Sequence, residues 1–433
     1  MSMKRNLTLA FAVFAAVAAP SAFATNGYFS HGYSLKEKAL AGAGVAMPQD
    51  AMASSTNPAG VVMVGQRMDL GAVWFRPERS YSVDANGGFW GMGGGIPESV
   101  DSDKNDFLIP NFGAVWVLDP NSALGLAVYG NGGMNTTYPG SAQRGAGTFF
   151  GGAFSGNAHA GVDLSQVFMN LSYARKINET SSWGASAIIA YQRFKATGLS
   201  AFANFSNDRT HLTDNGYDSS TGYGAKLGWT GEVSQGLSLG ASYQTKISMG
   251  EFDKYKGLFA ENGGFDIPST WTVGLAYQTT KSSTLLLDVQ RINYTDVKSV
   301  SNRETNLTGC MGGDTSQCLG GSEGAGFGWK DMTVVKLGYQ WETNPAHTWR
   351  VGYSKTKQPI RDDELMFNIL VPAVVEQHFT FGFTNKMSKN NELTLSAMYA
   401  PEKKVSGTDA VMGENIQIKM TEYEIGVNYG WKF

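Results

Sequence analysis

The sequence predicts an all-β protein, a 14-stranded antiparallel transmembrane β-barrel preceded by a short segment that is not strand. Three observations lead to this fold class: an export signal at the N-terminus, alternating segments longer than ordinary soluble strands, and connections that alternate between short and long. Of the 433 residues, 42% are hydrophobic and only 16% are charged, and 54 are glycine.

The first 24 residues have the layout of a secretory signal peptide. Lys4 and Arg5 give a positive start, residues 7–19 form an apolar run, and Ala22-Phe23-Ala24 is an A-x-A cleavage site. We therefore expect residues 1–24 to be removed and the mature chain to begin at Thr25. No later run of about 20 apolar residues occurs, so no transmembrane helix is expected.

Charge and chemistry exclude several function classes. The net charge is −3, without the basic clusters that nucleic-acid binding requires. The two cysteines, Cys310 and Cys318, lie in one Gly/Ser/Thr-rich stretch, and in an exported protein we expect a disulfide. Metal binding is the weaker alternative because no histidine is near. None of the five histidines lies in a G-x-S-x-G or H-E-x-x-H context, so no enzyme, cofactor or metal site is expected.

The clearest strand is the C-terminal sequence TEYEIGVNYGWKF. One face carries Tyr423, Ile425, Val427, Tyr429, Trp431 and Phe433, and the other is polar or glycine. This period-two pattern extends over about a dozen residues, whereas soluble strands usually have five or six. A membrane barrel strand needs about 9–11 residues, apolar outside and polar inside.

Fourteen such segments follow one another, an even number that suits a bacterial barrel. They are residues 67–79, 107–119, 122–133, 163–177, 182–199, 221–233, 237–249, 269–280, 283–295, 329–343, 347–360, 376–387, 391–405 and 419–433. Their connections alternate between short turns and long loops, as periplasmic turns and extracellular loops do. We expect residues 67–433 to form the barrel.

Residues 25–66, ahead of the first strand, are rich in small residues and are expected to fold into the lumen as a hatch. Residues 35–41 can form a short helix, with Ser34 as N-cap and Gly42 as its stop. A free tail would more often be charged or rich in proline and serine.

This segment carries a resemblance to a known family. The sequence NGYFSHGYSLKEKALAGAGVA, followed by DAMASSTNPAG, resembles the N-terminal hatch of the FadL family of outer-membrane long-chain fatty acid and hydrocarbon transporters. The hatch motif is Asn57-Pro58-Ala59, and the similarity continues through residues 116–138, 267–277 and 329–339. The resemblance implies a 14-stranded barrel whose hatch blocks the lumen.

The family also implies a kinked third strand that leaves a lateral opening in the barrel wall. The matching stretch is Asn131-Gly132-Gly133. Paired glycines weaken a strand ladder and permit a bulge or bend. The alternative is an ordinary end of a strand, since residue 133 lies near the expected boundary.

Candidate ligand-binding residues come from two places. Long loops near residues 200–220 and 250–268 are unusually apolar, with Phe202, Phe205, Leu258 and Phe259 as candidates for a capture groove. Their alternative role is loop packing, or contact with lipopolysaccharide. For the inner site the resemblance implies apolar hatch residues, Tyr28 and Phe29, and basic wall residues, for which Arg193, Lys195 and Arg303 are the candidates. For Arg193 and Lys195 the alternative is a solvated strand end.

The predicted function is passive outer-membrane transport of hydrophobic compounds, long-chain fatty acids first and aromatic or aliphatic hydrocarbons second. Expected partners are the hydrophobic ligand, outer-membrane lipid and lipopolysaccharide, with no nucleic acid, and we expect a monomer. A wall position that is basic in the family falls near Gly198 here, which weakens the expectation of a carboxylate clamp and leaves room for an uncharged hydrocarbon ligand. A general diffusion porin and a surface adhesin or receptor remain alternatives.

Overall fold

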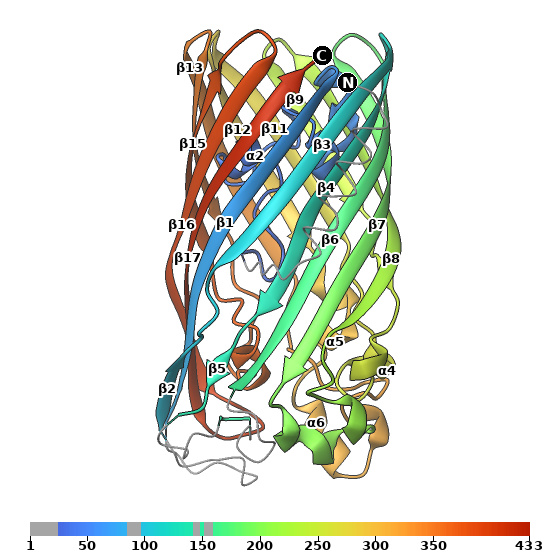
Figure 1. Cartoon of the computed structure of the whole chain (residues 1–433), viewed down its shortest axis with the longest axis vertical. Helices are drawn as coiled ribbons and strands as arrows, with labels where there is room; N and C mark the ends of the chain where they lie inside the picture. The colour runs from blue at the N-terminus through green and yellow to red at the C-terminus, as the bar shows by residue number, and fades with distance from the viewer. Residues whose placement is uncertain (1–24, 85–96, 142–147, 151–158) are drawn as a thin grey trace.

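The computed structural model describes residues 25–84, 97–141, 148–150 and 159–433, and its main body is a tall closed barrel (Figure 1). The predicted signal peptide, residues 1–24, lies outside the described residues. The C-terminus lies at one end of the barrel, and the helices α4 (Ala260–Gly263), α5 (Lys298–Ser301) and α6 (Asn306–Met311) gather at the other end (Figure 1).

Fourteen long antiparallel strands form the barrel wall, as predicted. They are β1 (Arg67–Val83), β3 (Phe107–Asp119), β4 (Ser122–Asn135), β6 (His159–Lys176), β7 (Ser181–Thr197), β8 (Asp218–Ser234), β9 (Leu237–Gln244), β11 (Thr270–Thr280), β12 (Ser283–Ile292), β13 (Met332–Asn344), β14 (His347–Lys355), β15 (Gln377–Lys386), β16 (Asn391–Thr408) and β17 (Asn415–Lys432). Pairing of β1 with β17, from Arg67↔Lys432 to Val83↔Ile416, closes the barrel. Three short strands extend the wall: β2 (Glu98–Asp101), β5 (Tyr138–Pro139) and β10 (Ser248–Met249).

The alternation along β17 shows why these segments form a membrane wall. Ile425 is 58% exposed on the outside, whereas Glu422 and Glu424 are buried on the inside. Lipid accepts the apolar face, and on the polar face Glu424 pairs with Lys38 in the lumen at 2.7 Å. Among the described residues, no helix is both long and apolar enough to cross a membrane.

Two strands end five residues earlier than predicted, at their extracellular ends. The strand predicted over residues 237–249 ends at Gln244, and the chain then turns so that Ile247 is fully buried and pairs with Ile267. The strand predicted over residues 347–360 ends at Lys355, after which the Thr356 hydroxyl bonds the carbonyl of Thr333. In both places loop packing overrides the local alternation.

The remaining helices are all short. The N-terminal segment contains α2 (Leu35–Lys38), α3 (Ala53–Thr56) and the 3-10 helix η1 (Pro58–Met63). The loops carry α4 (Ala260–Gly263), α5 (Lys298–Ser301), α6 (Asn306–Met311), η5 (Ser200–Phe205), η6 (Arg209–His211), η7 (Asp253–Tyr255), η8 (Tyr294–Asp296), η9 (Thr315–Gln317) and η10 (Phe367–Ile369).

Residues 25–64 lie inside the barrel, with α2 in its lumen (Figure 1). The Ser34 hydroxyl caps α2 by accepting a bond from the Lys36 backbone amide at 3.2 Å, but the helix is shorter than predicted and ends at Lys38. The wall holds this segment by charge: Lys36 pairs with Glu392 at 2.5 Å and Lys38 with Glu424 at 2.7 Å.

Candidate functional site

The wall changes at β4, where the N-terminal segment replaces a neighbouring strand. Pairing of β3 with β4 reaches no further than Phe112↔Val128, although β4 continues along β6 to Asn135. On the edge that β3 leaves, the Ser30 amide donates to the Asn131 carbonyl and the Gly133 amide donates to the Tyr28 carbonyl, each at 3.0 Å. The N-terminal segment therefore acts as a short strand beside β4.

The stretch Asn131-Gly132-Gly133 makes this docking possible. The register of β4 against β6 shifts between Gly130 and Gly132, so Asn131 is an extra residue in the ladder. A Cβ atom at Gly132 would overlap the carbonyl oxygen of Tyr28. The strand continues past this point, so the structure has a bulge here and not the ordinary strand end that was the alternative.

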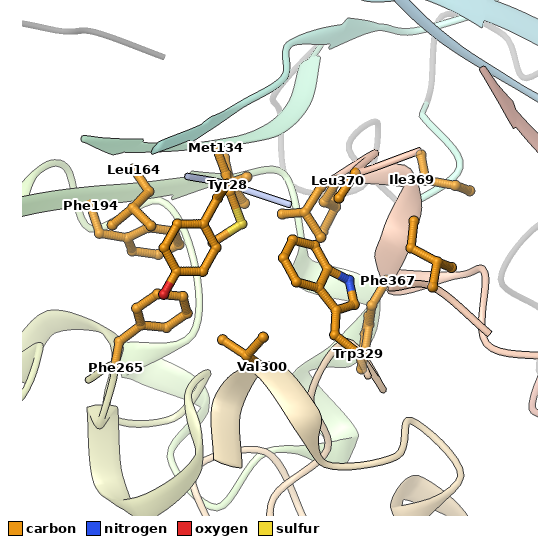
Figure 2. Close-up of a cluster of buried hydrophobic side chains, with 14 of the residues drawn as sticks. Tyr28, Met134, Leu164, Phe194, Phe265, Val300, Trp329, Phe367, Ile369 and Leu370 are labelled. Carbon is orange, nitrogen blue, oxygen red and sulfur yellow. The ribbon is translucent and has the colours of Figure 1, made fainter. Parts of the chain in front are cut away.

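Tyr28, a residue of the hatch, lies at the centre of a buried aromatic cluster (Figure 2). Its ring centroid lies 5.3 Å from Tyr294, 6.0 Å from Trp329 and 6.1 Å from Phe265. The Tyr294 hydroxyl donates to the Asn26 carbonyl at 2.5 Å and accepts from the Tyr28 amide at 3.2 Å. The cluster thus ties the start of the described chain to the loop after β12.

An apolar cavity of about 40 Å³ lies beside this cluster. Strands β4, β6 and β7 and the loops after β7, β10, β12 and β14 enclose it. Its side chains are Met134, Val162, Phe194, Leu199, Phe202, Leu258, Phe259, Ser299, Leu319, Ala325, Phe327, Phe367, Leu370 and Val371, with Gly326. Of the described residues, none that lines the cavity is charged, and Ser299 supplies the polar side chain.

The structure brings together most of the predicted apolar residues. Phe202, Leu258 and Phe259 line the cavity, and Tyr28 and Phe29 lie in the adjoining cluster. Phe205 is half-buried against the same cluster. The predicted capture groove between residues 200–220 and 250–268 is closed at Gly257. There the Gly257 amide donates a hydrogen bond to the His211 carbonyl at 3.0 Å.

Arg193 and Lys195 do not face the lumen, so their prediction as a carboxylate clamp is wrong. Gln192, Phe194 and Ala196 are the buried inward residues of β7, and alternation turns Arg193 and Lys195 outward. Both cations lie over the ring of Tyr217, at 4.1 Å and 5.1 Å from its centroid. The alternative of a solvated strand end does not describe Arg193 either, because its Nε and Nη2 atoms are buried without a hydrogen-bond partner among the described residues.

Arg303 lies in the loop after β12 and pairs with two acidic residues of the loop after β14. Its guanidinium contacts Asp363 at 2.8 Å and also Glu364. It does not line the cavity. Its contacts link two extracellular loops and leave it no position against a ligand in the cavity.

Several residues of the site were not predicted from the sequence. Met134, Phe194, Phe327, Phe367 and Leu370 line the cavity. Phe367 and Leu370 belong to the apolar run at residues 365–370. Such a run is unusual inside a long loop and was the sequence pattern that indicated them. Phe194 belongs to β7, whose side chains alternate between the two faces of the wall. Because Trp183 faces lipid, the odd-numbered residues of β7 point outward and Phe194 points inward.

The motif Asn57-Pro58-Ala59 lies where the hatch contacts strands β7 and β8. The Asn57 side-chain amide donates to the carbonyls of Val45 at 2.8 Å and Trp229 at 3.0 Å, and its oxygen accepts from Ala59 at 3.1 Å. Asn57 caps η1 in this way. A Cβ at Gly228 would overlap the Asn57 side chain, so glycine lets the motif reach the wall.

Cys310 and Cys318 are joined by a disulfide, with Cα atoms 4.7 Å apart, in the loop after β12. In the part of the chain that the structure describes, no group of three or more His, Cys, Asp or Glu side chains is placed to hold a metal ion.

Comparison with known proteins shows which family this barrel represents. The family model described as "Outer membrane protein transport protein (OMPP1/FadL/TodX)" matches residues 11–429. The chain belongs to the OMPP1/FadL/TodX family. It is therefore a β-barrel transport protein of the bacterial outer membrane. No curated protein sequence matches it.

Solved structures of this family share the fold over nearly the whole chain. The P. putida toluene transporter TodX is similar with a TM-score of 0.67 at 17% identity, covering 93% of this chain and 99% of that one. A Pseudomonas aeruginosa FadL homologue has a TM-score of 0.67 at 14% identity, covering 94% and 100%. The Ralstonia pickettii toluene transporter TbuX has a TM-score of 0.61 at 16% identity, covering 93% and 99%.

Proposed function

We propose that this OMPP1/FadL/TodX family member carries small hydrophobic molecules through the outer membrane, with the apolar cavity as their binding site. The observation that carries this proposal is the cavity itself, which is lined by aromatic and aliphatic side chains at the extracellular half of the lumen. Apolar lining with few polar groups is typical of sites for hydrophobic ligands. TodX and TbuX are named as toluene transporters, which is consistent with such a ligand.

Uncharged hydrocarbons fit this cavity better than ionised fatty acids. A buried carboxylate requires a cation or several donors, because an unpaired charge away from water is costly. Arg193 and Lys195 point outward, and Arg303 is already paired with Asp363 and Glu364. Long-chain fatty acids, the first expectation from the sequence, would need a rearrangement that brings a cation to the cavity.

The proposed route passes from the apolar loops into the cavity and then toward the bilayer. At about 40 Å³, the cavity has to widen before it can hold a hydrocarbon, so the surrounding side chains have to move. Release of Tyr28 and Ser30 from β4 would expose the edge that β3 does not pair. This lateral route suits an apolar cargo, because such a molecule gains nothing by entering the aqueous periplasm.

The test is uptake by cells that express the full chain and lack other transporters of this family. We expect radiolabelled toluene and dodecane to enter faster than in cells with an empty vector, and oleate to enter more slowly than either. Leu258→Trp should fill the cavity and reduce uptake at least about fivefold. Leu239→Trp places the same ring on the lipid face, where Leu239 is 36% exposed, and should leave uptake unchanged.

Two results would favour the alternatives. Rapid swelling of proteoliposomes in small sugars would indicate a diffusion porin and contradict a plugged lumen. If cells that express the correctly folded protein took up hydrocarbon no faster than cells with an empty vector, the result would instead support an adhesin or receptor.

A further inference from the structure

Three exposed lysines lie on neighbouring segments at the extracellular end of strands β13 and β14. They are Lys330, Lys355 and Lys357, which we call the lysine patch. Lys355 pairs with Val335 in the β13–β14 ladder, and the Lys330 amide bonds the carbonyl of Pro359 at 3.0 Å. These backbone contacts bring the three lysines onto adjacent segments of the wall.

The lysine patch lies just beyond an aromatic band on the outer face. Lys355 follows Tyr353 by two residues on the same outward side, and the Tyr353 ring lies 5.1 Å from Phe379. Tyr399 and Tyr423, 5.5 Å apart, continue the band. Such bands mark the membrane interface, and two strand residues advance about 7 Å. Lys355 therefore reaches the head-group level of the outer leaflet.

The patch also differs from its surroundings in its ion pairing. Elsewhere at this end, Lys246 pairs with Asp266 and Lys403 with Glu376, each at 2.8 Å or less. Within the described ranges, Lys330, Lys355 and Lys357 form no ion pair. Three positive charges without an ion-pair partner near the membrane interface indicate an anionic partner there.

We propose that the lysine patch binds the phosphate groups of lipopolysaccharide in the outer leaflet. Lipid A carries its phosphates at the boundary between acyl chains and sugars, the level that Lys355 reaches. Lysine ammonium groups bind phosphate oxygens through charge-assisted hydrogen bonds. Tyr353 and Phe379 below them offer an apolar surface for the acyl chains. This site is independent of the cargo cavity inside the barrel.

The test measures binding of purified bis-phosphorylated lipid A to the full-length protein in a non-ionic detergent. The variant is Lys330→Gln/Lys355→Gln/Lys357→Gln. The matched control is Lys176→Gln/Lys281→Gln/Lys389→Gln, three lysines near turns at the opposite rim that form no ion pair among the described residues. Heat-modifiable migration on gels confirms that each variant has a folded barrel.

We expect the patch variant to bind lipid A at least about tenfold more weakly and the control variant to bind like wild type. Lipid A stripped of its phosphates should bind wild type as weakly as the patch variant binds the intact lipid. Equal affinity of wild type and patch variant would overturn the proposal. So would a similar loss in the control variant, or full-strength binding of phosphate-free lipid A.

Discussion

The carbonyl oxygen of Tyr28 occupies the space that a side chain at Gly132 would need. This contact joins the N-terminal segment to the β4 bulge, next to the cavity. It links the hatch and the wall at the point where β3 and β4 part. A motion that moves the N-terminal segment away from β4 has to break this contact.

Gly132→Ala should release the N-terminal segment from β4. The added methyl group cannot share space with the Tyr28 carbonyl, so the bonds Ser30–Asn131 and Tyr28–Gly133 are lost. We expect amide hydrogen exchange in residues 28–30 to rise at least about tenfold. Gly250→Ala is the control, since a Cβ there meets ordinary contacts at 3.5 Å or more. Unchanged exchange in Gly132→Ala would show that the segment does not depend on this contact.

Lys38→Met should destabilise the protein by about 3–5 kcal/mol, because it leaves Glu424 buried without its partner. The double variant Lys38→Met/Glu424→Met should recover most of this loss. Lys403→Met, which breaks a more exposed pair with Glu376, should cost less than about 1 kcal/mol. Denaturant unfolding followed by tryptophan fluorescence measures the free energy of unfolding of all three variants. If the losses caused by Lys38→Met and Glu424→Met simply added in the double variant, the result would contradict the expectation.

Stability should fall as the pH rises through neutrality because of Glu37 in the hatch. Burial, reinforced by the nearby Asp50, raises the pKa of Glu37 from 4.5 to about 8. The unfolded chain loses this proton above about pH 4.5 and the folded chain only near pH 8, so stability is lost between these values.

Glu37→Gln removes this titration and keeps an acceptor for the Thr56 hydroxyl, which bonds Glu37 at 2.6 Å. From pH 5 to pH 8, wild type should lose on the order of 3 kcal/mol more than the variant. Unfolding free energies at the two pH values measure the difference. Parallel losses in both proteins would show that Glu37 does not carry the effect.

Asn57→Ala should destabilise the hatch by about 2–4 kcal/mol, since it removes the cap of η1 and the bonds to Val45 and Trp229. Asn57→Ser retains a capping oxygen and should lose less. Because Asn57 does not line the cavity, folded Asn57→Ala protein should transport at the wild-type rate. Limited proteolysis reports the first effect and radiolabelled uptake the second. Reduced uptake per folded molecule would assign the motif a part in transport.

The sequence predicted the fold closely and the site only in part. Strand β3, predicted over residues 107–119, has those bounds in the structure, and the fourteen long strands are all present. Period-two alternation is a local pattern set by lipid on one side and the lumen on the other, so each strand could be recognised by itself.

The site depends on contacts that no local pattern contains. Phe202, Phe259 and Phe367 belong to three different loops, and they form one cavity because the barrel brings those loops together. The apolar loop residues could be named from composition, but their common enclosure could not. Arg193 shows the other limit: a basic residue near a strand end suggested a clamp, whereas its register places it outside.

The sequence by itself determined the class of protein, the number of strands and the face that each strand turns to lipid. These properties follow from side chains two residues apart. Tertiary structure decided that residues 28–30 pair with β4. Among the described residues, it also decided that no cation lines the cavity and that the lysine patch has no ion-pair partner. These features join residues a hundred or more positions apart, or neighbouring strands, and they exist only once the barrel has closed.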